Sequence, residues 1–124
     1  MLNKIIIMGR MTRDPEIWQT NSGRTVATFS LACERDFKNK DGQKETDFID
    51  CVCYGGSAEF VKSYFGKGSM TVACGRLQIR DWTDHDGNKR RQAEIVCDSV
   101  YFGETKRSGG FSELAPADDG ELPF

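Results

Sequence analysis

The chain has 124 residues, of which 38% are apolar and 29% are charged, and this suits one globular domain with a substantial core. No stretch approaches the roughly 20 apolar residues of a membrane-spanning helix, and residues 5–8 are too short for a signal peptide, so we expect a cytoplasmic protein. The formal net charge of −2 is uneven, because all 17 Lys and Arg lie within residues 1–107 while residues 108–124 hold four acids and no base. We therefore expect the body and the acidic end to bind different partners.

Cysteine usage argues against disulfides and metal. An odd number of cysteines within strand-like runs suits a reducing compartment and thiols that serve as small core side chains; they are Cys33, Cys51, Cys53, Cys74 and Cys97. A zinc pair needs a longer spacing than Cys51-x-Cys53, and the only histidine is His85. We expect neither a structural metal nor another cofactor.

The first strand is predicted over residues 3–9, where the apolar run Ile5-Ile6-Ile7-Met8 is continuous rather than alternating. Such a strand should meet protein on both faces, which suggests a subunit contact. Asp14-Pro15 and Asn21-Ser22-Gly23 then mark a loop around Trp18. A tryptophan in a loop clamps that loop onto the core more often than it stacks on a base, so we expect the first role for Trp18.

Two alternating strands follow, joined by a polar hairpin loop with the turn signal Asp41-Gly42. In residues 25–33 the larger side chains, Ala27, Phe29, Leu31 and Cys33, share one face that should be core. In residues 46–54 one face carries Ile49, Cys51 and Cys53, and the other carries Phe48, Asp50, Val52 and Tyr54. The second face has no other large apolar side chains against which its two aromatic rings could pack. We therefore expect these rings to contact a partner outside the strand.

Residues 57–66 form the one convincing helix, which Ser57 can cap and Gly66 can end. Strands are then predicted over residues 69–82 and 92–102, joined by a charged hairpin. Five strands with a helix between the third and fourth predict an all-β fold, a five-stranded OB-type barrel with one short helix. Beyond about residue 104 the apolar pattern stops, and we expect a disordered acidic C-terminal tail.

Motifs for catalysis are missing from the sequence, so we expect no enzyme. Cys51 or Cys53 as nucleophile would need a histidine base, and His85 lies in a turn where a solvated role is far commoner. Asp84 and Asp86 could hold a metal for nuclease chemistry, but the turn alone explains them. The chain has no P-loop, dinucleotide fingerprint or serine-hydrolase elbow.

Exposed aromatic rings with basic neighbours instead favour binding of unpaired nucleic acid. The candidate rings are Phe37, Phe48, Tyr54 and Trp82, and the candidate cations are Arg35, Lys38, Arg76, Arg80, Lys89 and Arg90. Rings stack on bases of any sequence while Lys and Arg follow the phosphates, and each stacked base contributes about 1–3 kcal/mol. Any one ring could be a core residue, but other apolar residues already fill the inward positions.

Several segments together resemble the bacterial single-stranded DNA-binding protein family. They are Asn3-Lys4-Ile5-Ile6-Ile7-Met8-Gly9-Arg10, Asp14-Pro15-Glu16, Val26-Ala27-Thr28-Phe29-Ser30-Leu31-Ala32, Lys67-Gly68-Ser69, Gly75-Arg76-Leu77 and Trp82-Thr83-Asp84. The terminal Asp-Asp-Gly-Glu-Leu-Pro-Phe is similar to the acidic tip of that family. The resemblance covers residues 1–104 in order, and the tip adds an independent signature.

The resemblance implies an OB-fold domain over residues 1–104 that forms a homotetramer and binds single-stranded DNA without sequence preference in replication, recombination and repair. It implies base stacking by the four candidate rings and a nucleoid-associated location in the cytoplasm. A flexible linker over 105–117 would lead to a tip over 118–124 that recruits replication and repair enzymes. The tip residues that would bind them are Asp118, Asp119, Glu121, Leu122, Pro123 and Phe124.

Two other readings stay open at the level of sequence. In the first, the barrel binds a protein partner as an adaptor and the acidic tail only keeps the chain soluble. In the second, the barrel is an OB-fold module for RNA or tRNA. DNA affinity separates the first from our interpretation, and a comparison of DNA with RNA oligonucleotides of equal length separates the second.

Overall fold

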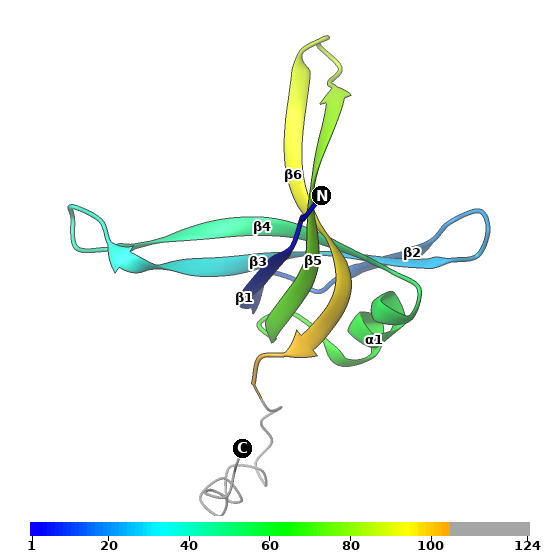
Figure 1. Cartoon of the computed structure of the whole chain (residues 1–124), viewed down its shortest axis with the longest axis horizontal. Helices are drawn as coiled ribbons and strands as arrows, with labels where there is room; N and C mark the ends of the chain where they lie inside the picture. Colours follow the sequence, from blue (N-terminus) through cyan, green and yellow to red (C-terminus); the bar gives the residue numbers. More distant parts are fainter. Residues whose placement is uncertain (105–124) are drawn as a thin grey trace, which may run out of the picture.

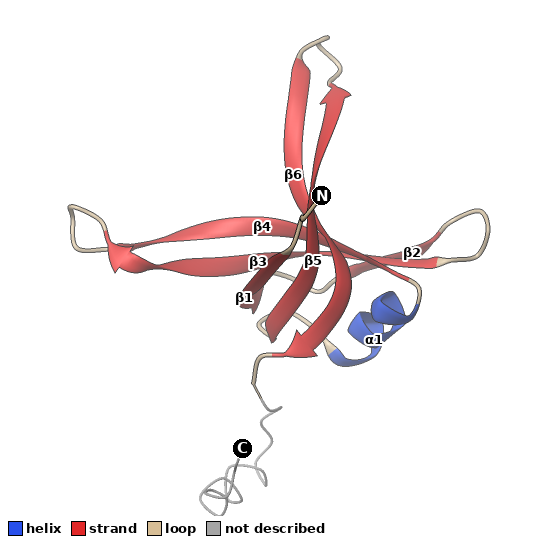
Figure 2. Ribbon diagram, in the orientation of Figure 1, coloured by secondary structure: helices blue, strands red, loops and turns tan. Residues whose placement is uncertain are grey.

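The computed structural model describes residues 1–104, so the predicted linker and tip lie outside the described residues. This part of the chain forms six strands and one short helix, arranged as in Figures 1 and 2. In chain order these are β1 (Ile5–Met11), β2 (Glu16–Gln19), β3 (Thr25–Lys38), β4 (Lys44–Tyr54), α1 (Gly56–Tyr64), β5 (Met70–Thr83) and β6 (Lys89–Phe102). No helix in this part of the chain is long and apolar enough to cross a membrane.

The long strands form a closed barrel. Hydrogen-bonded neighbours follow the order β1-β5-β6-β4-β3-β2, and an additional pairing between β1 and β3 closes the sheet on itself. The closure is short, since it joins only Arg10 to Ala32 and Met11 to Leu31. β4 and β6 run parallel, and the other pairs are antiparallel. The five-stranded barrel with one short helix is the predicted fold, and β2 is added at its edge.

The core lies between the inward faces of these strands and α1. Phe29, Leu31 and Ile95 are its large members from the strands, and Ala58 and Val61 bring α1 against it. The alternation that predicted an inward face on β3 and β4 is therefore confirmed. On β3 the burial extends to the second face as well, where Val26 has no exposed surface.

Three buried thiols lie together within this core. Cys51 and Cys53 are at most 2% exposed and Cys97 is 7% exposed. Cys51 and Cys53 each form a hydrogen-bonded contact with Cys97, and this contact, together with burial, raises the pKa of both thiols. A thiol with a raised pKa stays protonated and is a poor nucleophile at neutral pH. The two cysteines are small core residues, as the sequence predicted.

Two local predictions are wrong. The segment around Trp18, predicted as a loop, is strand β2 and pairs antiparallel with β3. The helix cap is Gly55 rather than Ser57, with no side-chain hydrogen bond, and the helix ends at Tyr64 rather than Gly66. Gly55 has a φ of 64°, a left-handed conformation that glycine adopts without the Cβ clash of other residues. The tight turn from β4 into α1 therefore needs a glycine more than it needs a polar cap.

Strand β1 also differs from its prediction. Ile5 and Ile7 pack against the core, whereas Ile6 is 64% and Met8 is 57% exposed. One face of the strand is thus covered within the chain and the other is open. The predicted burial of both faces needs a second subunit.

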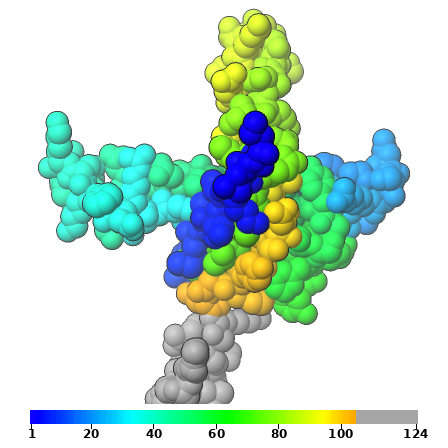
Figure 3. Space-filling view, in the orientation of Figure 1, coloured from blue at the N-terminus to red at the C-terminus, as the bar shows by residue number. Residues whose placement is uncertain are grey.

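Three hairpins extend from the barrel as arms. In Figure 1 the far end of β3 and β4 projects to the left, the tip of β5 and β6 projects upward, and the β2–β3 turn projects to the right. The space-filling view in Figure 3 shows the first two standing clear of the body. Their side chains are consequently accessible to a long flexible ligand.

Candidate nucleic-acid interface

Two of the four predicted rings stand on the outer face of β4. Phe48 is 69% exposed and Tyr54 is 38% exposed, whereas Cys51 and Cys53 on the opposite face are buried. Opposite them on β3 lie Ala32, which pairs with Phe48, and Val26, which pairs with Tyr54. The two residues are six positions apart along the strand, a distance of about 20 Å at the usual rise per residue.

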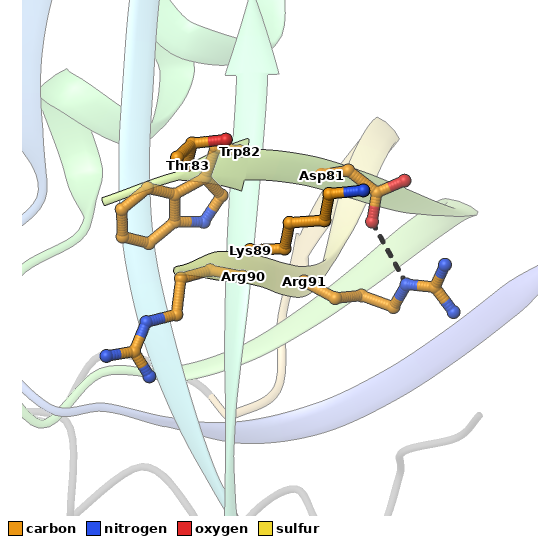
Figure 4. Close-up of a pocket in the computed structure, with 6 residues that line it drawn as sticks. All are labelled: Asp81, Trp82, Thr83, Lys89, Arg90 and Arg91. Atoms are coloured by element: carbon orange, nitrogen blue, oxygen red, sulfur yellow. Dashed lines mark hydrogen bonds and ion pairs between the residues drawn. The ribbon is translucent and has the colours of Figure 1, made fainter. Parts of the chain in front are cut away.

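The third ring lies on the β5–β6 hairpin. Trp82 is 47% exposed and pairs with Arg90 across the hairpin, so the two side chains share a face. A hollow of about 530 Å³ adjoins them, and Figure 4 shows Trp82 and Arg90 at one end of it and the Asp81–Arg91 pair at the other. Arg76 and Arg80 lie at even spacing from Trp82 on β5 and therefore on the same face.

Polar contacts join this hairpin to β4. Gln92 on β6 donates from Nε2 to Oδ2 of Asp50 at 2.8 Å, and Asp50 is directly opposite Glu94 in the parallel pairing of β4 with β6. Arg80 contacts both Gln92 and Glu94, at 3.4 and 3.5 Å. Asp50 shares its face with Phe48, so these contacts connect the face that carries Trp82 to the face that carries Phe48.

The fourth ring lies near the end of the β3–β4 arm. Phe37 is 81% exposed, in a stretch where the pairing of β3 with β4 is irregular between Glu34 and Lys38. None of the four rings packs against another aromatic ring within residues 1–104. The rings that do pack together are Phe60, Tyr64, Phe65 and Phe102, around α1 and the end of β6. The sequence-predicted rings are thus separate from the aromatic cluster of the body.

Carboxylates already neutralise part of the predicted cationic surface. Arg35 donates from Nε and Nη2 to the two carboxylate oxygens of Asp47, at 3.0 and 2.9 Å, and from Nη1 to Glu45 at 2.9 Å. The hydrogen bond from Arg35 holds the pKa of Asp47 below its usual range, and the same pairing raises the pKa of Arg35. A phosphate that binds Arg35 must compete with two carboxylates.

Asp84 has a similar role in the β5–β6 hairpin. Its Oδ1 accepts the backbone N–H groups of Asp86 and Asn88, and its Oδ2 accepts Nε of Arg90 at 2.9 Å. The Asn88 N–H is the main reason that the pKa of Asp84 is lowered, and Arg90 lowers it further. This carboxylate organises the turn, as the sequence predicted, and at the same time engages Arg90.

The remaining predicted cations differ in their surroundings. Lys38, Arg76 and Lys89 form no ion pair within residues 1–104, although Arg76 donates to Oε1 of Gln78 at 2.8 Å. Lys89 pairs with Thr83 and so points to the face of the hairpin opposite Trp82. Arg76, Arg80 and Arg90 therefore share the strand face of Trp82, and Lys89 lines the same hollow as Trp82 from the other strand face.

Sequence reasoning missed one cation. The Arg24 guanidinium carbon lies 4.9 Å from the centre of the Tyr54 ring, a cation–π geometry. Arg24 follows the Asn21–Gly23 turn signal, and its position in the β2–β3 hairpin could have been noticed only if β2 had been recognised as a strand. The pairing of β3 with β4 then brings it to Tyr54, 30 residues along the chain.

Comparison with known proteins agrees with this geometry. The model of the single-strand binding protein family matches residues 2–103. Single-stranded DNA-binding protein 1 of Staphylococcus aureus is 45% identical over 108 residues, which are 87% of this chain and 65% of the relative. Single-stranded DNA-binding protein A of Bacillus subtilis is 43% identical over 110 residues, which are 89% of this chain and 64% of the relative. The match thus spans just under two thirds of the length of these relatives.

Among solved structures, a Plasmodium falciparum SSB in complex with ssDNA superposes with a TM-score of 0.77 at 28% sequence identity. The superposition covers 84% of this chain and 96% of that one. The barrel, the exposed rings and these likenesses lead to one conclusion: the chain belongs to the single-strand binding protein family.

Proposed function

We propose that this protein binds single-stranded DNA without sequence preference, through residues 1–104. The observation that carries the proposal is the outer face on which Phe48 and Trp82 are exposed and joined through the Asp50–Gln92 and Arg80–Glu94 contacts. A solvent-exposed ring on a strand face costs apolar hydration in the free protein, and an unpaired base is a flat partner that removes this cost. Phe37 and Tyr54 extend the same path.

The cations of the site supply the sequence-independent part of the affinity. Lys38 and Arg76 are available for phosphates, and Arg35, Arg80 and Arg90 become available when a phosphate displaces their carboxylates. Because each exchange costs an existing ion pair, charge contributes less here than the number of basic residues suggests. Stacking on the rings then dominates the affinity, which fits a protein whose formal net charge is −2.

The open face of β1 supports a proposed homotetramer. Ile6 and Met8 are more than half exposed, and Tyr101 on β6 reaches the same face because Met8 pairs with Val72 and Val72 pairs with Tyr101. Exposed apolar side chains that are contiguous across three strands are typical of subunit interfaces. Within residues 1–104, the stretch 5–9 of this strand pairs with β5 on one side only, which leaves its second edge for another chain in the proposed tetramer.

The roles of the C-terminal residues rest on the family resemblance. We propose that residues 105–117 link the barrel to a tip that recruits enzymes of replication, recombination and repair, with Asp118, Asp119, Glu121, Leu122, Pro123 and Phe124 as the contact residues. Removal of residues 118–124 should keep DNA binding, slightly strengthened by the loss of a competing anion, and abolish capture of a helicase or exonuclease. Capture of these enzymes by the truncated chain would contradict the proposal.

Titration of the protein with labelled oligo-dT, followed by fluorescence anisotropy, tests the central proposal. We expect saturable binding that weakens with salt, with a log–log slope of about −0.7 for each phosphate neutralised. Oligo-dA and mixed-sequence DNA should bind comparably, and an RNA oligonucleotide of equal length separates a DNA-binding from an RNA-binding module. A protein that binds no oligonucleotide at low salt would be an adaptor instead.

A further inference from the structure

Trp18 lies on the same outer face as Tyr54. Trp18 on β2 is directly opposite Val26 on β3, and Val26 is directly opposite Tyr54 on β4. Residues that are opposite each other in a sheet share a face, so the three side chains form a row across three strands. Val26 has no exposed surface, whereas the rings on either side of it remain open, Trp18 at 50% and Tyr54 at 38%.

The core does not need the Trp18 ring. Its neighbour Ile17 points to the other face and packs against the core cluster, so Ile17 holds β2 to the barrel. The expected role of Trp18 as a clamp onto the core is therefore wrong. The ring lies beside Val26 in the β2–β3 pairing, is half exposed, and is not part of the core cluster.

A cation stands beside this row. Arg24 is exposed, lies over the Tyr54 ring and forms no ion pair within the part of the chain that the structure describes. In this respect it differs from Arg35 and Arg90, each of which engages a carboxylate. A guanidinium on an aromatic face can turn toward a phosphate without breaking an ion pair.

We propose that Trp18 and Arg24 form, with Tyr54, a further nucleotide-binding subsite that continues the DNA path from β4 across β3 onto β2. The inference rests on the proposed function. Two strand spacings separate Trp18 from Tyr54, about 10 Å, a distance that about three nucleotides cover at the stacked spacing of one DNA strand. The base stacks on Trp18, and the guanidinium of Arg24 meets a phosphate between the two rings.

The surroundings of the row favour nucleic acid over a protein partner. The open apolar face of β1 carries Ile6, Met8 and Tyr101 as a contiguous patch. The row across β2 and β4 instead holds two separated rings with an unpaired guanidinium beside one of them, and it continues along β4 to Phe48. Proteins commonly bind single-stranded nucleic acid through aromatic rings interspersed with cationic side chains.

The chain has two tryptophans, so Trp82→Phe leaves Trp18 as the sole tryptophan reporter. DNA binding by this variant is measured independently by the anisotropy of labelled oligo-dT. We expect Trp18 emission to be quenched in step with the anisotropy and to become less accessible to iodide at saturation. Normal binding with unchanged Trp18 emission and accessibility would overturn the subsite while the proposed function stands. If the unmodified protein gives no anisotropy change, the proposed function fails and the subsite fails with it.

Affinity measurements separate the ring from the cation. Trp18→Ala should weaken oligo-dT binding about fivefold or more and leave its salt slope unchanged, because a stacking ring without charge is removed. Arg24→Gln should weaken binding and reduce the magnitude of the slope by about 0.7, and Arg24→Lys should restore the slope.

Tyr64→Ala provides the matched control, since it removes a 65% exposed ring on α1, away from this face. The control should bind as the unmodified protein does. A loss as large for Tyr64→Ala as for Trp18→Ala would overturn the subsite. A change in oligomeric mass for Trp18→Ala, measured by native mass spectrometry, would also overturn the subsite, because it would show that the ring contacts another subunit.

Discussion

Two outer surfaces of this barrel expose large apolar side chains, but they differ in charge. On the β1 side, Ile6, Met8 and Tyr101 form an apolar patch, and the cation at its border, Arg10, is paired with Glu104. On the β4 side and the β5–β6 hairpin, Phe48 and Trp82 stand among arginines and carboxylates. The contrast shows that exposure of apolar surface does not by itself identify a partner.

Strand β5 contributes to both surfaces and shows where one changes into the other. Along its outer face, Val72 and Cys74 lie beside Met8 and Ile6 of β1, and Arg76, Arg80 and Trp82 follow toward the hairpin tip. An unbroken apolar patch complements another apolar patch, such as that of a second copy of the chain. Rings separated by charged groups complement the alternating bases and phosphates of a single strand. The position of the charges therefore divides one strand between the two proposed interfaces.

The largest effect should come from charge placed on the β1 side. Ile6→Glu combined with Met8→Glu puts four like charges or more into an assembled interface, and burial of unpaired carboxylates costs several kcal/mol each. Native mass spectrometry should show the homotetramer replaced by smaller species. Both side chains are more than half exposed in the single chain, so the circular dichroism spectrum should be retained.

A glutamate in place of an exposed apolar residue on the other surface provides the control. Phe48→Glu should weaken DNA binding and leave the native mass unchanged. A tetramer that survives the paired β1 substitutions would place the subunit contact elsewhere and remove the distinction between the two surfaces.

The next largest effect should come from the rings themselves. Phe48→Ala and Trp82→Ala each remove one stacking partner, which weakens oligo-dT binding by about 5- to 150-fold, or about 1–3 kcal/mol. Because the two rings are 69% and 47% exposed, the free energy of unfolding should change little. Anisotropy titrations measure the first quantity, and urea denaturation measures the second.

The result that would contradict this assignment is the opposite pattern. A ring whose removal lowers the free energy of unfolding by several kcal/mol and spares DNA binding would be a core residue. Phe48→Trp serves as the conservative control, since a larger ring should keep or strengthen stacking while Phe48→Ala loses it.

The barrel could be predicted because most of its strands have a recognisable local sequence pattern. The alternation in residues 25–33 and 46–54 reflects burial on one face, and the turn at Asp41-Gly42 fixes the hairpin between them. β2 escaped prediction because four residues are too few to show a period and only Ile17 among them turns inward. The open face of β1 could not be recognised either, because a continuous apolar run does not reveal which side is covered by its own chain.

In the candidate site, the exposure of the rings was predictable from the sequence, but the ion pairs of the arginines were not. Phe48, Tyr54 and Trp82 could be found because large apolar residues at outward positions are unusual enough to need an explanation. The partners of the arginines depend on register across strands: Asp47 reaches Arg35 only through the β3–β4 pairing, and Glu94 reaches Arg80 only through β5–β6. Arg24 was missed for the same reason, since its contact with Tyr54 depends on the pairing of β3 with β4.

The smallest expected effect tests whether carboxylates restrain the DNA surface. Asp47→Asn keeps the shape of the side chain but removes one of the two carboxylates that hold Arg35. Oligo-dT affinity should rise by at most about fivefold, because an exposed ion pair contributes about 0–1 kcal/mol, and the salt slope should steepen by up to about 0.7. Acidification cannot replace the substitution: the pKa of Asp47 is held below its usual value, so at about pH 5 the carboxylate remains ionised and still engages Arg35.

Asp41→Asn is the control that separates local release from a general gain in positive charge. Asp41 lies at the turn of the same hairpin, and within residues 1–104 its carboxylate forms no ion pair. Both variants change the net charge equally, so an equal gain in affinity would show that only the overall field matters. A gain confined to Asp47→Asn would show that Arg35 binds phosphate more strongly once one of its two carboxylate partners is removed, and hence that its ion pairs restrain its contact with DNA.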